Sequence, residues 1–155
     1  SLPGGNTIEF TGVAVTDLSK RLAIRPKNMS PSPTASPCVF ADDTYYCSAK
    51  GPFTPGPRNL QGIWVATVET QVRQTMRNLL DGLEEAGLGL SNVVATNVYL
   101  DDINDFARMN RIYAQYFAEM PPARITLAQI APADRTPINA DTYPGLEQIS
   151  LIAVK

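Results

Sequence analysis

Residues 67–86 carry the feature that most constrains the fold, a single long amphipathic helix. Apolar side chains recur there at three- and four-residue spacing, which places them on one stripe of a helix. The stripe consists of Val68, Val72, Met76, Leu79, Leu80 and Leu83. The polar residues between them, including Gln71, are expected to face water, and Gly87 supplies a C-terminal stop. The stripe is therefore interpreted as one wall of a hydrophobic core.

The segments around this helix alternate between apolar and polar residues, as strands do. A second helix is predicted at about 103–118, with Phe106 and Met109 among its buried residues. Strands are predicted at 21–25, at a hairpin of 39–40 and 44–49, and at 92–100, 124–129 and 148–154. The order β-β-β-α-β-α-β-β predicts an α+β fold with two helices on one face of one sheet. The other face is left bare, so we expect oligomerisation.

Composition excludes several classes of function. The chain has 155 residues, enough for one domain with a real core. A net charge of −2 argues against nucleic acid as a partner, and no apolar run approaches the roughly 18 residues that span a membrane. The absence of histidine removes His-based catalytic triads and His-ligated zinc. No metal or other cofactor is predicted.

The two cysteines give a mild indication of the compartment. Cys38 and Cys47 fit no metal-binding spacing, and two cysteines do not make a disulfide scaffold. We therefore expect a reducing compartment and a cytoplasmic location.

Arg124 is the most informative charged residue. Pro121 and Pro122 end the preceding helix, and Arg124 starts the strand that follows them. Alternation places Arg124 on one face with Thr126, and Ile125 on the other. A buried charge is costly unless it is paired, so an arginine here needs an anionic partner or a functional reason. An ordinary edge or surface arginine is the alternative.

Two segments near the ends of the chain resemble each other. Residues 8–15 (IEFTGVAV) and 147–154 (EQISLIAV) have the same outline, and each follows a turn with Pro and Gly. The similarity predicts a tandem protein, in which residues 1–18 are the closing strand of a preceding repeat and residues 19–155 form one domain. Chance similarity between short apolar strands is the alternative.

Several motifs together resemble the RidA/YjgF family of enamine/imine deaminases, also labelled endoribonuclease L-PSP. They are Tyr46-Cys47-Ser48-Ala49, residues 71–79 (QVRQTMRNL), residues 92–96 (NVVAT), Asn104-Asp105-Phe106 with Asn110 and Tyr113, and Pro122-Ala123-Arg124. The resemblance implies a chorismate-mutase-like fold, with a mixed sheet, two helices on one face and a barrel-forming oligomer, usually a trimer. Its sites would lie in clefts between subunits, or between this repeat and a preceding one in a pseudo-oligomer.

The resemblance also implies roles for individual residues. Arg124 would clamp the carboxylate of a small 2-imino or 2-enamino acid, which suits the planar, permanently charged guanidinium. Ser48 and Asn110 would hold substrate or water, and Thr126 stands where the family often has cysteine. The implied reaction is hydrolysis of an imine to a keto acid and ammonia by a positioned water.

The last strand departs from the family pattern at the residue that handles the water. Gln148 falls where active members carry a glutamate, and a glutamine cannot accept a proton. Glu147 is expected to point to the opposite face, whereas Glu9 falls at the glutamate position of the first closing strand. We expect either a deaminase with an altered or shared site, or a non-catalytic binding and oligomerisation module. Ribonuclease activity has only the family label in its favour.

Overall fold

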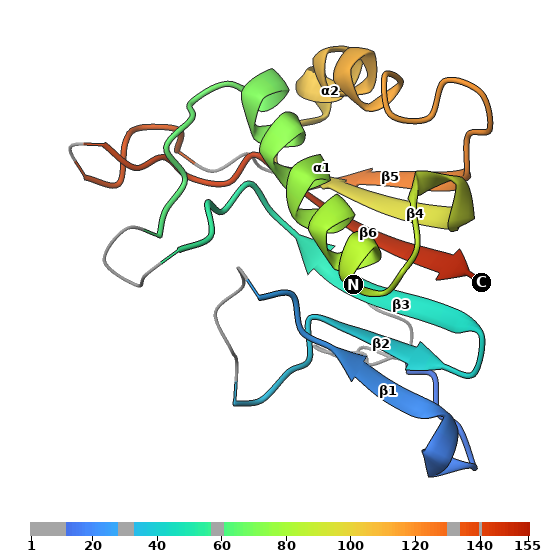
Figure 1. Ribbon diagram of the computed structural model, residues 1–155. Coiled ribbons are helices and arrows are strands. Elements are labelled where there is room, and N and C mark those ends of the chain that lie inside the picture. The colour runs from blue at the N-terminus through green and yellow to red at the C-terminus, as the bar shows by residue number, and fades with distance from the viewer. Residues whose placement is uncertain (1–11, 28–32, 57–60, 130–133, 140) are drawn as a thin grey trace, which may run out of the picture.

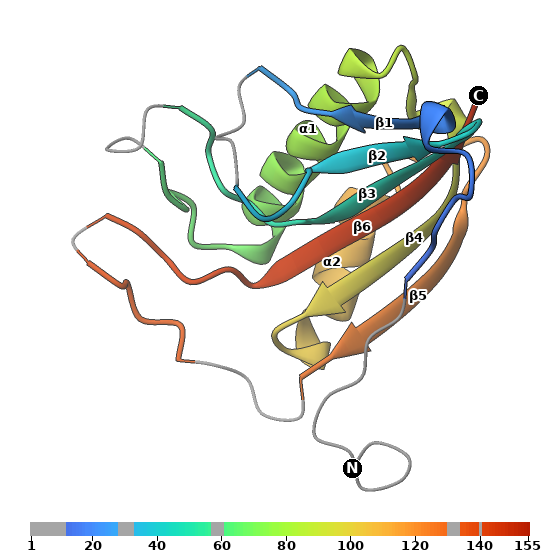
Figure 2. The same cartoon turned by 90° about the horizontal axis from the view of Figure 1, so that it is seen from below.

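The computed structural model describes residues 12–27, 33–56, 61–129, 134–139 and 141–155, which form one mixed sheet and two α-helices. The sheet has the order β1-β2-β3-β6-β4-β5 (Figure 2). Only β4 and β5 pair in parallel, and the other neighbours are antiparallel. The strands are β1 (Arg21–Ile24), β2 (Cys38–Ala41), β3 (Thr44–Lys50), β4 (Val93–Leu100), β5 (Ala123–Ala128) and β6 (Glu147–Val154). This confirms the predicted α+β architecture.

Both helices cover the same face of the sheet (Figure 1). Helix α1 (Val68–Glu85) begins after Thr67, whose side chain caps the Thr70 N–H, and ends before Gly87, which has a φ of 73°. Its apolar stripe packs on the sheet, and the core consists mainly of Val68, Val72, Met76, Leu79, Leu83, Met109, Val98, Ile149 and Leu151. The long helix is therefore core-forming, as its periodicity predicts.

The second helix is shorter than predicted. A 3-10 turn at Ile103–Asp105 leads into α2 (Phe106–Tyr113), and turns follow after Tyr113. Met109 is fully buried, but Phe106 is 38% exposed, so the prediction that Phe106 is buried is wrong. Its ring lies at the edge of the sheet, over the side chain of Arg124.

The opposite face of the sheet, called the open face below, is covered by none of the described α-helices. Tyr99 and Leu127 are direct neighbours across β4 and β5, and both remain exposed together with Ile125. Gly12–Val15 and side chains of β1, β2, β3, β4 and β6 line a hollow of about 810 Å³. Within the segment 8–15, which was predicted to belong to the closing strand of a preceding repeat, residues 12–15 form no strand, and the remaining part, with Glu9, lies outside the described residues. In the part of the chain that is described, no helix has the length and apolar character to cross a membrane.

Candidate functional site

Arg124 lies near the start of the edge strand β5 and faces the helices, as alternation predicts. Its Nη1 donates a hydrogen bond to Asn110 Oδ1 at 2.8 Å. Its guanidinium carbon lies 5.5 Å from the ring centroid of Phe106 and 4.8 Å from that of Tyr113. These three partners are spaced by four and three residues, so one face of α2 presents them all. Two cation–π contacts and one neutral hydrogen bond therefore orient the guanidinium.

The charge of Arg124 is not neutralised by the described part of the chain. Arg108 and Arg111 both pair with Glu69, and Arg135 pairs with Asp105, whereas no described carboxylate lies within ion-pair distance of Arg124. Arg124 instead lines a pocket of about 320 Å³ with Asn110, Tyr113, Ala114, Phe117, Pro121 and Pro122. An oriented guanidinium without its own anion is suited to bind an anionic ligand.

Helix α1 carries a buried polar row that its apolar periodicity did not predict. Gln71 is fully buried, so the prediction that it faces water is wrong. Its side chain donates to the carbonyls of Val65 and Pro144 and accepts from the Leu146 N–H at 2.7 Å. About two turns further along the same face of α1, Asn78 Nδ2 donates to the carbonyls of Gly51 and Phe53. The row fastens the segments that lead into β6 and out of β3. The signal was available in the run of polar residues at positions 71, 75 and 78, which have helical spacing.

Glu147 and Gln148 point to opposite faces of β6, as predicted. Glu147 is 2% exposed beneath α1, where its Oε1 accepts a hydrogen bond from the Thr75 hydroxyl. Its Oε2 is buried without a hydrogen-bond partner among the described residues, and burial raises the pKa of Glu147 to about 8. Gln148 is exposed and lies opposite Tyr99 of β4. A glutamine thus occupies the accessible position, while the neighbouring carboxylate belongs to the core.

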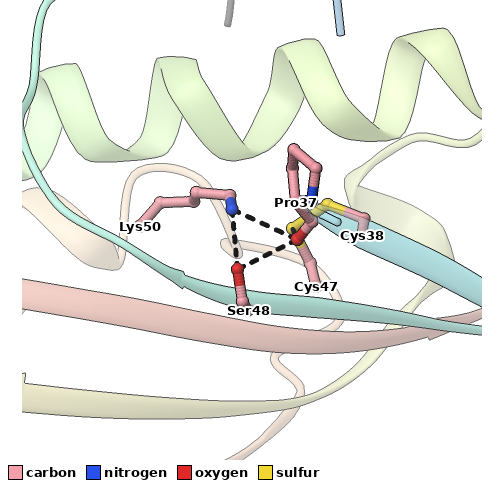
Figure 3. Close-up of a disulfide and its surroundings, with 5 residues drawn as sticks. All are labelled: Pro37, Cys38, Cys47, Ser48 and Lys50. Carbon is pink, nitrogen blue, oxygen red and sulfur yellow. Dashed lines mark hydrogen bonds between the residues drawn. A yellow bond between two sulfur atoms is a disulfide. The ribbon is translucent and has the colours of Figure 1, made fainter. Parts of the chain in front are cut away.

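Ser48 lies at an irregularity of β3, where Cys47 and Lys50 pair with Leu151 and Ile149 of β6. The side chains of Ser48 and Lys50 meet there at the carbonyl of Pro37 (Figure 3). Ser48 Oγ donates to this carbonyl at 3.0 Å, and Lys50 Nζ donates to it at 3.1 Å and to Ser48 Oγ at 2.8 Å. The structure therefore adds Lys50 to the neighbourhood of a predicted site residue.

A disulfide joins Cys38 of β2 to Cys47 of β3, directly opposite each other in the hairpin (Figure 3). The sequence pattern, which favoured a reducing compartment, did not anticipate this bond. Its spacing of nine residues gave no signal, because the pairing depends on the register of the hairpin. The bond links the residue after Pro37 to the residue before Ser48.

The predicted site residues do not all meet within one chain. Arg124 and Asn110 come together, and Thr126 shares their face of β5, with its Oγ1 buried and without a hydrogen-bond partner among the described residues. Gln148 lies two strands away from Arg124, three residues further along and on the open face, about 14 Å distant by sheet geometry. Ser48 lies three strands away on β3, again about 14 Å distant. Glu9 lies outside the described residues.

This chain is similar to a family model, to known proteins and to solved structures. The family model described as Endoribonuclease L-PSP matches residues 27–135. A RutC family protein of Pyrococcus horikoshii is 47% identical over 60 residues, which cover 39% of this chain and 48% of that protein, so the match spans about half the length of this relative. A RutC family protein of Saccharolobus solfataricus is 35% identical over 108 residues, 70% of this chain and 83% of that protein. Among solved structures, the YjgF gene product of E. coli has a TM-score of 0.70 at 26% identity, covering 86% of this chain and 98% of that one.

Proposed function

Because this chain belongs to the Endoribonuclease L-PSP family, we propose that it is a hydrolytic deaminase of small 2-imino or 2-enamino carboxylates. The observation that carries the proposal is Arg124, a half-buried guanidinium that neutral groups orient and that no described carboxylate neutralises. The pocket beside it has the size of a small ligand, at about 320 Å³. A carboxylate bound there would make two parallel charge-assisted hydrogen bonds, which fix the position of the adjacent C=N carbon.

The proposed chemistry is attack on this carbon by water, followed by loss of ammonia and release of a 2-keto acid. Exposed Gln148 would hold the water through its amide, in the position where active relatives are expected to carry glutamate. The amide orients water but accepts no proton, so the part of the site that holds the attacking water is altered. We accordingly propose a slow enzyme, in which substrate binding is better preserved than proton transfer.

We further propose that the site is shared between copies of the chain. In one chain Arg124 lies on the edge strand, while Ser48 and Gln148 lie on β3 and β6. A neighbouring copy would pack against the open face, where Tyr99, Ile125 and Leu127 are exposed. This packing would bring Arg124 of one copy close to Ser48 and Gln148 of the other. The proposed assembly is a trimer with a central barrel. A pseudo-oligomer with a preceding repeat, closed by residues 1–18 with Glu9, is the tandem form of the same proposal.

The second candidate function is a non-catalytic binding module. The observation in its favour is Gln148, because a site without a proton acceptor still binds a carboxylate through Arg124. Ribonuclease activity, which the family description names, finds no support in a chain with a pI of about 5.1 and no histidine.

The test measures ammonia and 2-ketobutyrate released from 2-iminobutyrate by the full chain. Release that disappears in the Arg124→Ala variant supports the enzyme, and no release by the unaltered chain overturns it. If the unaltered chain binds 2-ketobutyrate through Arg124 but releases no ammonia, the binding module is the correct function. Mixing Arg124→Ala chains with Ser48→Ala chains then tests the shared site: activity returns in the mixture only if two copies contribute to one site.

A further inference from the structure

Lys50 differs in its surroundings from the lysines that face acidic residues. Lys20 lies 2.8 Å from Asp42, which raises the pKa of this lysine, and Lys155 lies 3.6 Å from Asp43. Lys50 is half-buried at the end of β3, and no described carboxylate lies within ion-pair distance of it. Burial lowers the pKa of Lys50, because nothing here compensates the desolvation of an ammonium group.

The two contacts of Lys50 suit a neutral amine. A neutral amine has two N–H bonds and one lone pair, whereas an ammonium has three N–H bonds and no lone pair. Lys50 Nζ donates to two oxygens, the Pro37 carbonyl at 3.1 Å and Ser48 Oγ at 2.8 Å (Figure 3). Both N–H bonds of the amine are thereby used, and the lone pair is left for an electrophile.

The same contacts hold the amine beside an accessible surface. Ser48 is exposed and lines the hollow on the open face of the sheet. The disulfide between Cys38 and Cys47 ties together the two segments that carry Pro37 and Ser48. The amine is thus held in place by a covalently braced hairpin, and a small carbonyl compound that reaches Ser48 comes within reach of Lys50.

We propose that Lys50 is a nucleophile that forms a Schiff base with the 2-imino or 2-keto acid bound at this site. This inference rests on the proposed deaminase function and on the proposed sharing of the site between copies, because Ser48 and Arg124 of one chain lie about 14 Å apart, and it names a covalent step in that function. The Lys50 amine adds to the carbon of the C=N bond, both hydrogens of the amine pass as protons to the substrate nitrogen, this nitrogen leaves as ammonia, and a C=N bond to Nζ remains. Water then adds to that carbon, the Nζ–carbon bond breaks, and the keto acid and the free amine are released. The sum is imine plus water giving keto acid plus ammonia.

In this route the loss of ammonia requires no carboxylate at position 148, whereas the later hydrolysis of the Schiff base still uses water, which Gln148 would orient. Direct attack on an imine needs an acceptor for a proton of the water, which Gln148 does not provide. An amine attacks without such a base when it is already neutral. Ser48 serves as the positioning residue, since its Oγ fixes one N–H of the amine.

The test incubates the full chain with 2-ketobutyrate and cyanoborohydride, which reduces a Schiff base to a stable secondary amine, and maps the modified lysines by peptide mass spectrometry. We expect labelling of Lys50 to exceed that of Lys20 and Lys155 by at least about tenfold, as desolvated lysines exceed exposed ones in reactivity. Labelling of Lys50 at the rate of these two internal controls overturns the proposal. So does ammonia release by Lys50→Arg within about twofold of the unaltered chain, since a guanidinium forms no such Schiff base.

The outcomes for Lys50 and for the deaminase function are separable. The trapping reaction starts from the keto acid, so it proceeds whether or not the chain hydrolyses imines. A labelled Lys50 without ammonia release from 2-iminobutyrate refutes the deaminase and leaves a carbonyl-binding lysine. Ammonia release without a labelled Lys50 refutes the covalent step and leaves the deaminase. Lys50→Gln, which retains a donor toward Pro37, provides a second variant if Lys50→Arg fails to fold.

Discussion

Asn110 Oδ1 accepts a hydrogen bond from Arg124 Nη1 at 2.8 Å, and this contact joins α2 to the edge strand β5. A carboxylate at position 110 would neutralise the guanidinium and occupy it permanently. The asparagine orients the same N–H with a neutral oxygen and leaves the positive charge available. Asn110 thus orients the guanidinium of Arg124 without neutralising its charge.

Replacing Asn110 by Asp is therefore expected to stop the Arg124 guanidinium from binding a ligand carboxylate, while the orientation of the guanidinium is kept. The new carboxylate pairs with Arg124 and competes with the ligand carboxylate for charge-assisted hydrogen bonds. The dissociation constant for 2-ketobutyrate, measured by calorimetry, should rise by about 10- to 100-fold, the value of one or two such bonds. Asn110→Ala is the control, because it removes the orienting oxygen but not the charge, and should lose less. Equal binding by Asn110→Asp and the unaltered chain would show that Arg124 does not hold the ligand.

Gln148→Glu should raise the rate of ammonia release. The exposed side chain on β6 would then accept a proton from water as well as orient it, and general base catalysis contributes about 10²–10⁴-fold in enzymes. We expect kcat for 2-iminobutyrate to rise at least about tenfold, with KM changed less. Gln148→Ala should show no such gain. An unchanged kcat in Gln148→Glu would mean that proton transfer at this position does not limit the reaction.

Glu147→Gln should stabilise the protein in alkaline solution. Burial raises the pKa of Glu147 to about 8, so between about pH 4.5 and pH 8 the folded chain holds a proton that the unfolded chain has lost. Stability therefore falls as the pH rises through this range, and a neutral amide at position 147 would avoid the loss while still accepting from the Thr75 hydroxyl. The free energy of unfolding in urea should favour the variant by up to about 5 kcal/mol at pH 9, and by little at pH 5.

The exposed Glu85 at the end of α1 provides the matched control for that measurement. Glu85→Gln removes one carboxylate without touching the core. A difference at pH 9 that is the same for both variants would contradict a specific contribution from the buried Glu147.

Leu127→Asp should weaken the proposed assembly. Leu127 is 55% exposed beside Tyr99 on the open face, and a charge in an apolar interface costs several kcal/mol when desolvated. Analytical ultracentrifugation should report a lower mass than for the unaltered chain. Ile138→Asp is the control, because Ile138 is 71% exposed but lies in the loop between β5 and β6. If Leu127→Asp sediments like the unaltered chain, the open face is not the interface.

Reducing the bond between Cys38 and Cys47 should loosen the hairpin of β2 and β3. The bond closes a short loop, and closures of this size contribute about 2–3 kcal/mol in the chain-entropy description. Alkylation of the protein purified in air should label neither cysteine, and after a reductant it should label both, with a lower midpoint of thermal unfolding. Labelling before reduction would contradict the bond.

Local patterns in the sequence predict the helices, the strands and the faces on which their side chains lie. The repeat of apolar residues predicts the helix at 67–86, found as α1, and alternation places Arg124 and Ile125 on opposite faces of β5. These features depend on backbone periodicity, which each segment carries within itself. The direction of Glu147 was predictable for the same reason.

Which polar side chains are buried, and what they bind, depends on how the elements pack together. Gln71 looked solvent-facing because it is polar, yet it is fully buried, and it binds the Pro144 carbonyl in the loop before β6 and the Val65 carbonyl before α1. The contact of Phe106 with Arg124 and the pairing of Cys38 with Cys47 likewise join segments that only meet through sheet register and helix packing. Such partners cannot be deduced from local pattern, because burial is set by whatever packs against a residue and not by the residue itself.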